Sequence, residues 1–115
     1  MPEPGIVKYG FGAAETVALT ATGAQTVTVI NDLTVIDGVT VEATGNRTIN
    51  LTLGSDLNVG ARLIVTSKTN GTETTIFGTA ITGVTITGAA GKTKVTEFVY
   101  TGAAFVNTGT PVQID

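Results

Sequence analysis

The sequence predicts an all-β fold of about nine or ten short antiparallel strands, arranged as a sandwich, a barrel or a trimeric β-prism-like module. Threonine makes up roughly a fifth of the 115 residues, far above its usual share. Threonine and the abundant valine branch at Cβ, which favours extended, pleated backbone. The chain also contains 15 glycines, which suit the tight turns between strands.

Apolar and polar residues alternate with period two along most of the chain. Between Gln25 and Ile30, Val27 and Val29 share one face of the predicted strand, and threonines occupy the other. This pattern is typical of a half-buried antiparallel strand with one face on a core. The other predicted strands are 16–20, 33–41 (with Leu33, Val35, Val39 and Val41 alternating), 48–53, 62–66, 74–77, 84–87, 94–100 and 104–106.

The turns between these strands are marked by glycine. Asn70-Gly71 predicts a hairpin with a type I′ turn, because both residues tolerate positive φ, and Asp37-Gly38 predicts a second. Ser55–Gly60 is expected to be a loop that joins two strands.

A loose repeat follows three of the glycines, Gly23, Gly45 and Gly71. Each is followed three residues later by threonine, at spacings of roughly 20 to 26 residues. A solenoid or a meander of similar hairpins would produce this pattern, and we expect the meander.

The first twelve residues are expected to form an extended arm, followed by a single all-β domain over residues 13–115. Pro2 and Pro4 fix φ and lack a backbone donor, so neither a helix nor a central strand begins there. The apolar residues of the arm are expected to pack on its own domain or to contact a neighbouring subunit or another partner surface. The candidate contact residues are Ile6, Val7, Tyr9 and Phe11.

The charge of the chain argues against two classes of partner. The formal net charge is −3, with 6 basic and 9 acidic residues. Nucleic acids and anionic membrane surfaces both require clusters of Lys and Arg, so neither is expected as a partner. The first residues have neither the basic nor the apolar region of a signal peptide, and synthesis in the cytoplasm is expected.

The side chains that usually carry catalysis are scarce. The chain contains no histidine and no cysteine, which removes the common general base and the common zinc ligands. Gly91-Lys92-Thr93 is similar to the end of a P-loop, but Ile86 stands where that motif needs its first glycine.

The densest acidic cluster, Asp32, Asp37 and Glu42, is interrupted by apolar segments, and we interpret these residues as turn acids and not as calcium ligands. We therefore expect no enzyme activity, no catalytic residue, no cofactor and no metal site.

The segment from Thr48 to Val106 resembles modules of trimeric bacteriophage virion proteins, namely head decoration (cement) proteins and head- or tail-fibre modules. The likeness rests on the strand 49–53, a loop ending in Val59-Gly60, the strand 62–65, a threonine-rich strand over 72–77 and the ending Val95–Val106. Tryptophan is common in those modules where Phe105 stands here. The resemblance implies a trimeric β-fold on a virion and supplies no catalytic residues.

These observations predict a homotrimeric capsid decoration protein on the phage particle surface, with the major capsid protein or another virion protein as partner. The alternatives are a head- or tail-fibre module and a receptor- or glycan-binding β-domain. Arg62 and Glu97 are solvated outer residues or form a salt bridge between subunits. The candidate subunit-interface residues are Arg62, Glu97, Phe98, Tyr100 and Phe105.

Overall fold

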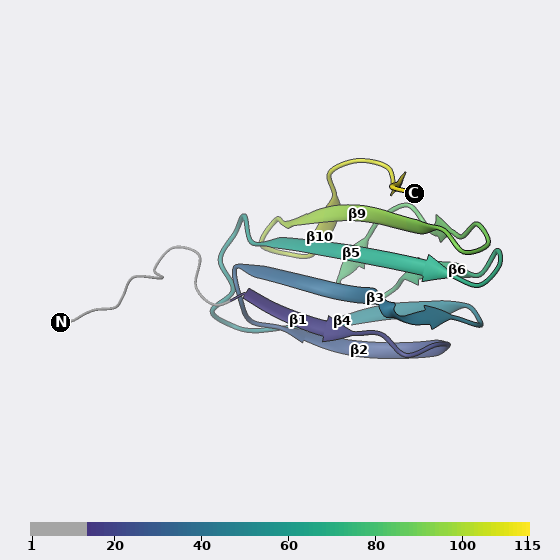
Figure 1. The fold of residues 1–115 in the computed structure, drawn as a ribbon. Coiled ribbons are helices and arrows are strands. Elements are labelled where there is room, and N and C mark those ends of the chain that lie inside the picture. The colour runs from purple at the N-terminus through teal and green to yellow at the C-terminus, as the bar shows by residue number, and fades with distance from the viewer. Residues whose placement is uncertain (1–13) are drawn as a thin grey trace.

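The computed structural model of this protein describes residues 14–115, which form two β-sheets that lie face to face (Figure 1). Sheet A contains β1 (Ala14–Ala18), β3 (Leu33–Ala43), β5 (Arg62–Thr69), β7 (Ile81–Thr82), β9 (Thr93–Tyr100), β10 (Phe105–Asn107) and β11 (Val112–Gln113). Sheet B contains β2 (Gly23–Val29), β4 (Arg47–Leu53), β6 (Thr74–Phe77) and β8 (Ile86–Thr87). The all-β prediction is confirmed for this part of the chain. The arm residues Ile6, Val7, Tyr9 and Phe11 lie outside it.

The first six strands form a short coil, because consecutive strands alternate between the two sheets. Each strand from β3 to β6 pairs in parallel with the strand two places earlier in the chain. A chain that crosses to the other sheet and returns lays down its next strand in the same direction. The prediction of antiparallel strands is therefore wrong for this part of the fold.

The predicted hairpin turns have other roles in the coil. Asn70-Gly71 lies in the connection that carries the chain from β5 in sheet A to β6 in sheet B. Asp37-Gly38 lies inside β3, where the register with β5 shifts after Gly38. A Cβ at Gly38 would collide with the carbonyl oxygen of Thr66, so this glycine allows a close approach of two backbones and not a turn. Ser55–Gly60 is a loop between β4 and β5, as predicted.

The loose glycine repeat corresponds to real turns of the coil, contrary to the meander that we expected. In sheet B, Gly23 is aligned with Arg47, and Arg47 is aligned with Thr75. The glycine pattern would instead have aligned Gly23 with Gly45 and Gly45 with Gly71. Each of these spacings is two residues shorter than the spacing of the residues that are aligned in the sheet.

Asparagine side chains connect successive turns of the coil. The Oδ1 atom of Asn46 accepts a hydrogen bond from the Thr74 backbone at 3.0 Å, and that of Asn50 accepts one from the Thr79 backbone at 2.8 Å. These bonds, which are exposed to solvent, give partners to the backbone N–H groups of Thr74 and Thr79.

Antiparallel strands close one end of the coil. In sheet A, β9 runs antiparallel to β5, and β10 and β11 each pair antiparallel with part of β9. In sheet B, β8 pairs antiparallel with β6. Figure 1 shows these strands at the upper side of the molecule, while β1 and β2 lie at the opposite side.

The core fills the space between the sheets. Val27 and Val29 point inward, as the alternation predicted. In the first part of β3 Thr34 and Ile36 are buried, both 0% exposed, whereas Leu33 and Val35 face outward. The core cluster consists of the buried apolar residues Leu19, Val27, Val29, Ile36, Ile49, Leu51, Ala61, Leu63, Val65, Ile81, Ile86, Phe98 and Phe105.

One charged side chain, Arg47, lies inside the fold with 1% of its surface exposed. Burial lowers the pKa of its guanidinium, while the nearby charges of Asp37 and Glu73 act in the opposite direction. The group remains protonated, because arginine keeps its charge in proteins. Its Nη atoms donate to the carbonyl oxygens of Val41 at 2.9 Å, Gly38 at 3.1 Å, Lys68 at 3.3 Å and Thr20 at 3.4 Å, and to Ser67 Oγ at 2.9 Å.

Through these bonds the Arg47 side chain links β4 to β3 and to β5. We predict that Arg47→Ala lowers the free energy of unfolding by about 3 kcal/mol or more, because several buried acceptors lose their donor and a cavity remains. Urea denaturation measures the loss. The control is Lys92→Ala, whose side chain is exposed and lies apart from this network, and which should cost at most about 1 kcal/mol. Equal losses in the two variants would contradict this role.

Candidate interaction surface

The outer face of sheet A, which points away from the core, is unusually apolar for a solvent-facing surface. Register places outward residues of neighbouring strands in rows, such as Val35 beside Ile64 and Arg62 beside Val99. Half-buried apolar side chains lie on β3, β5 and β9, and Val106 and Val112 at the margin are 38% and 59% exposed. The apolar residues of this face are Leu33, Val35, Ile64, Val95, Val99, Val106 and Val112.

The outer face of sheet B has a different chemistry. Its outward residues on β2 and β4 are mostly hydroxyl-bearing, with Thr28 beside Thr52 and Thr26 beside Asn50. Ile76 on β6 is an exposed apolar residue there, at 42%. The two faces of the molecule are therefore distinct, and the apolar face of sheet A is the candidate for contact with another protein.

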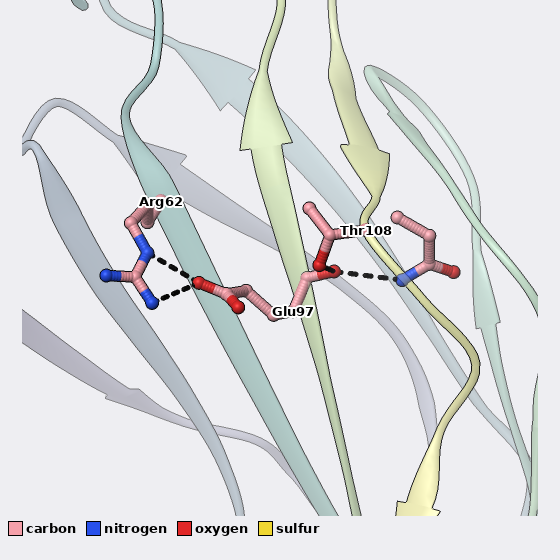
Figure 2. A network of polar contacts seen from close by, with 4 residues as sticks. Arg62, Glu97 and Thr108 are labelled. Carbon is pink, nitrogen blue, oxygen red and sulfur yellow. Dashed lines mark hydrogen bonds and ion pairs between the residues drawn. The ribbon is translucent and has the colours of Figure 1, made fainter.

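An ion pair lies within this apolar face, between Arg62 on β5 and Glu97 on β9 (Figure 2). The Nε atom of Arg62 donates to Glu97 Oε2 at 2.5 Å, and the Nη2 atom contacts the same oxygen. The backbone carbonyl of Glu97 accepts bonds from Asn107 Nδ2 at 3.1 Å and Thr108 Oγ1 at 3.3 Å. Because these two charges neutralise each other within one chain, the part of the face around them can approach an apolar partner without a lone charge from either residue.

A hollow of about 340 Å³ lies beside the ion pair, between β9 and the chain that follows β10. Its lining is mainly apolar or hydroxyl-bearing and includes Val95, Val112 and Ile114. Ile114 is 63% exposed, so a large apolar side chain faces solvent at the rim. Glu97 of the ion pair also lines the hollow, which has room for an apolar side chain of a partner.

The structure separates the five residues predicted for a subunit interface. Arg62 and Glu97 lie on the outer face of sheet A, as a pair within one chain. Phe98 and Phe105 are 0% exposed and belong to the core of the same chain, so neither reaches the surface of the single subunit. Tyr100 is half-buried, packs on Phe105 with ring centroids 5.3 Å apart, and donates its hydroxyl proton to the Gly102 carbonyl.

The apolar residues of the outer face were not selected from the sequence. Leu63, Ile64 and Val65 follow one another, so alternation alone does not tell which of them faces outward. An uninterrupted apolar run is itself the indication that a strand is covered on both faces.

The positions that were considered for other chemistry lie apart from one another. Gly91, at φ +73°, forms a turn before β9, and a strand follows Lys92 where a P-loop would need a helix. Asp32 accepts a bond from Asn58 Nδ2 at 3.0 Å, and Asp37 accepts bonds from the backbone N–H groups of Val39 and Thr40. Among residues 14–115 no group of three acidic, His or Cys side chains could hold a metal ion. No helix in this range is long and apolar enough to cross a membrane.

Comparison with family models, with curated proteins and with solved structures gave no match. The class of the protein is therefore defined by its structure: an all-β protein of two sheets, with a parallel two-sheet coil at one end and mainly antiparallel strands at the other.

Asp37 lies at the margin of the same face, in the row that contains Ala18 and Thr66. Its carboxylate accepts hydrogen bonds from Thr40 Oγ1 at 2.5 Å, from the Val39 backbone at 2.8 Å and from the Thr40 backbone at 3.1 Å. The Thr40 hydroxyl and then these backbone donors lower the pKa of Asp37.

A carboxyl with a lowered folded-state pKa stabilises the fold above its unfolded value, about 3.9, and this contribution is lost as the pH falls through the folded value. We predict that Asp37→Asn is less stable than the wild type at pH 7 and that the difference shrinks as the pH falls below about 4. Urea denaturation at a series of pH values measures this. A difference that stays constant down to the lowest pH would contradict the assignment.

Proposed function

We propose that this protein is a structural subunit of a bacteriophage virion, a homotrimeric capsid decoration (cement) protein on the particle surface. The observation that carries the proposal is the apolar outer face of sheet A, which contains a self-neutralised ion pair, Arg62 and Glu97, and is adjoined by an apolar hollow. A face of this kind supports binding to another protein surface. The likeness of residues 48–106 to phage head and fibre modules supports the choice of a virion.

The dimensions of the face allow it to form part of an interface between subunits. Five strands spaced by about 4.8 Å and about six residues long outline roughly 500 Å². Three copies that turn the face toward a common axis would each contact two neighbours and would close a ring without leaving it exposed. Each neighbour then receives about 250 Å² of the flat outline, so contacts outside this face contribute the rest of the ~800 Å² per partner in a typical stable interface.

The choice between a cement protein and a fibre module depends on where the trimer sits. A cement protein occupies the capsid lattice in many equivalent copies, whereas a fibre module occupies sparse vertices or the tail. We do not propose a glycan site, because Phe105 is 0% exposed and Tyr100 is half-buried, which leaves neither ring open for stacking on a sugar.

We predict that Ile64→Glu, which places a second carboxylate directly opposite Glu97 in the middle of the apolar face, converts the trimer to a monomer and leaves the circular dichroism spectrum unchanged. Sedimentation velocity at micromolar concentration measures the mass. The matched control, Thr52→Glu, places the same charge on the outer face of sheet B, opposite Thr28, and should remain trimeric. A monomeric wild type, or a trimeric Ile64→Glu, would refute this interface.

We also propose that the arm, residues 1–12, contacts the capsid. Deletion of these residues is predicted to abolish binding to capsids that lack the protein while the mass of the trimer is retained, because the subunit contacts are on sheet A. Co-sedimentation with capsids measures the binding. Full decoration by the shortened protein would exclude this role of the arm.

A further inference from the structure

The edge strands at the two ends of the molecule differ in length. At one end, β7, β8 and β11 are strands of two residues each. At the other end, β1 and β2 are the outermost strands of sheets A and B, with five and seven residues (Figure 1). A long strand at the edge of a sheet presents backbone donors and acceptors to another chain.

The backbone of β2 presents alternate residues to this free edge. Gly23 donates its N–H to Asn46 on the β4 side at 2.9 Å, and the carbonyl of Val29 accepts from Gly54 at 2.8 Å. In a parallel ladder these odd-numbered residues bond toward β4, and the even-numbered residues between them bond in the opposite direction. The N–H and C=O groups of Ala24, Thr26 and Thr28 therefore point to the free edge, where β2 pairs with no strand of the described chain.

At the neighbouring edge of β1, a side chain of the same molecule bonds to the open backbone groups. The Gln25 side chain donates from Nε2 to the Ala18 carbonyl at 3.0 Å and accepts at Oε1 from the Thr20 backbone at 2.9 Å. This side-chain amide takes the place of a partner strand at the end of β1. The edge of β2 has no such cover among the described side chains.

The sequence of β2, Gly-Ala-Gln-Thr-Val-Thr-Val, also lacks the residues that usually block edge pairing. It contains no lysine, no other charge and no proline, although soluble proteins commonly place such residues on exposed edges. The strand is thus open, uncharged and long enough to pair.

We propose that the edge of β2 is a self-association site, which joins two copies of this chain with their β2 strands antiparallel across a two-fold axis at Thr26. In this pairing Ala24 lies opposite Thr28 of the second copy, and Thr26 lies opposite its own equivalent. Each strand then uses the residues that its own ladder leaves open, which gives about six hydrogen bonds between the chains. The outward threonines of both strands stay on one face of a continuous sheet.

A second copy fits this edge better than the alternatives. An isologous contact requires a self-complementary surface, and the alternation of β2 about Thr26 is symmetric and uncharged. A head-to-tail stack would instead pair the seven residues of β2 with the two residues of β8. The contact is separate from the outer face of sheet A, so it goes beyond the proposed trimer and would double the mass of whatever assembly that face forms.

Disulfide trapping tests the pairing directly, because the chain contains no cysteine. In the proposed dimer the double variant Ala24→Cys, Thr28→Cys brings cysteines of different chains to a Cα separation of about 5.5 Å, within disulfide range. Within one chain the two positions are about 13 Å apart and cannot be bridged. We expect a reducible dimer on a non-reducing gel. The control Thr48→Cys, Thr52→Cys has the same spacing on the adjacent strand β4 and should give at least about tenfold less dimer.

Thr26→Pro provides a second measurement. Proline removes an N–H that points to the free edge and leaves the β2–β4 ladder intact, so the dissociation constant of the dimer should rise by at least about tenfold in sedimentation equilibrium. Cross-linking no stronger than in the control would overturn the proposal. So would a wild type that remains a monomer or a simple trimer up to roughly 0.1 mM, or β2 pairing only with a strand of a different protein.

Discussion

The parallel pairing between successive turns of the coil is the constraint on which the rest of the structure depends. The connections between β2 and β3 and between β3 and β4 have three residues each, so the chain crosses between sheets with little freedom. Parallel register then fixes which side chains are neighbours on each face. The apolar rows of sheet A and the hydroxyl rows of sheet B both follow from this register, and so does the free edge at β2.

The faces of the strands could be predicted from the sequence, but their direction could not. Period-two alternation is the same in parallel and antiparallel strands, so Val27 and Val29 were placed correctly inside without any knowledge of their partners. The glycine repeat was two residues out of register in each turn, and an even shift leaves every side chain on its proper face. Glycine marked the close backbone contact at Gly38 as strongly as it marks turns, which is why a hairpin was predicted inside β3.

The candidate site could be predicted only in part, for a related reason. Arg62 and Glu97 were selected because each is a charge beside apolar residues, but their partnership depends on the antiparallel pairing of β5 with β9. Phe98 and Phe105 were selected as aromatics and lie in the core. The burial of Arg47 was not predicted at all, since its acceptors are backbone carbonyls that only the coil brings together.

The two proposed contacts differ in physical origin, and this difference separates their behaviour in solution. Contact through sheet A removes apolar side chains from water, so it should weaken on cooling and should be insensitive to modest salt. Contact through β2 relies on backbone hydrogen bonds whose formation replaces bonds to water, so its net strength depends on how well the two edges match. The coil fixes both surfaces, because the register that aligns the apolar rows of sheet A also determines which backbone groups of β2 remain open. A change in that register would therefore alter both contacts together, whereas substitutions at Ile64 and Thr26 address them one at a time.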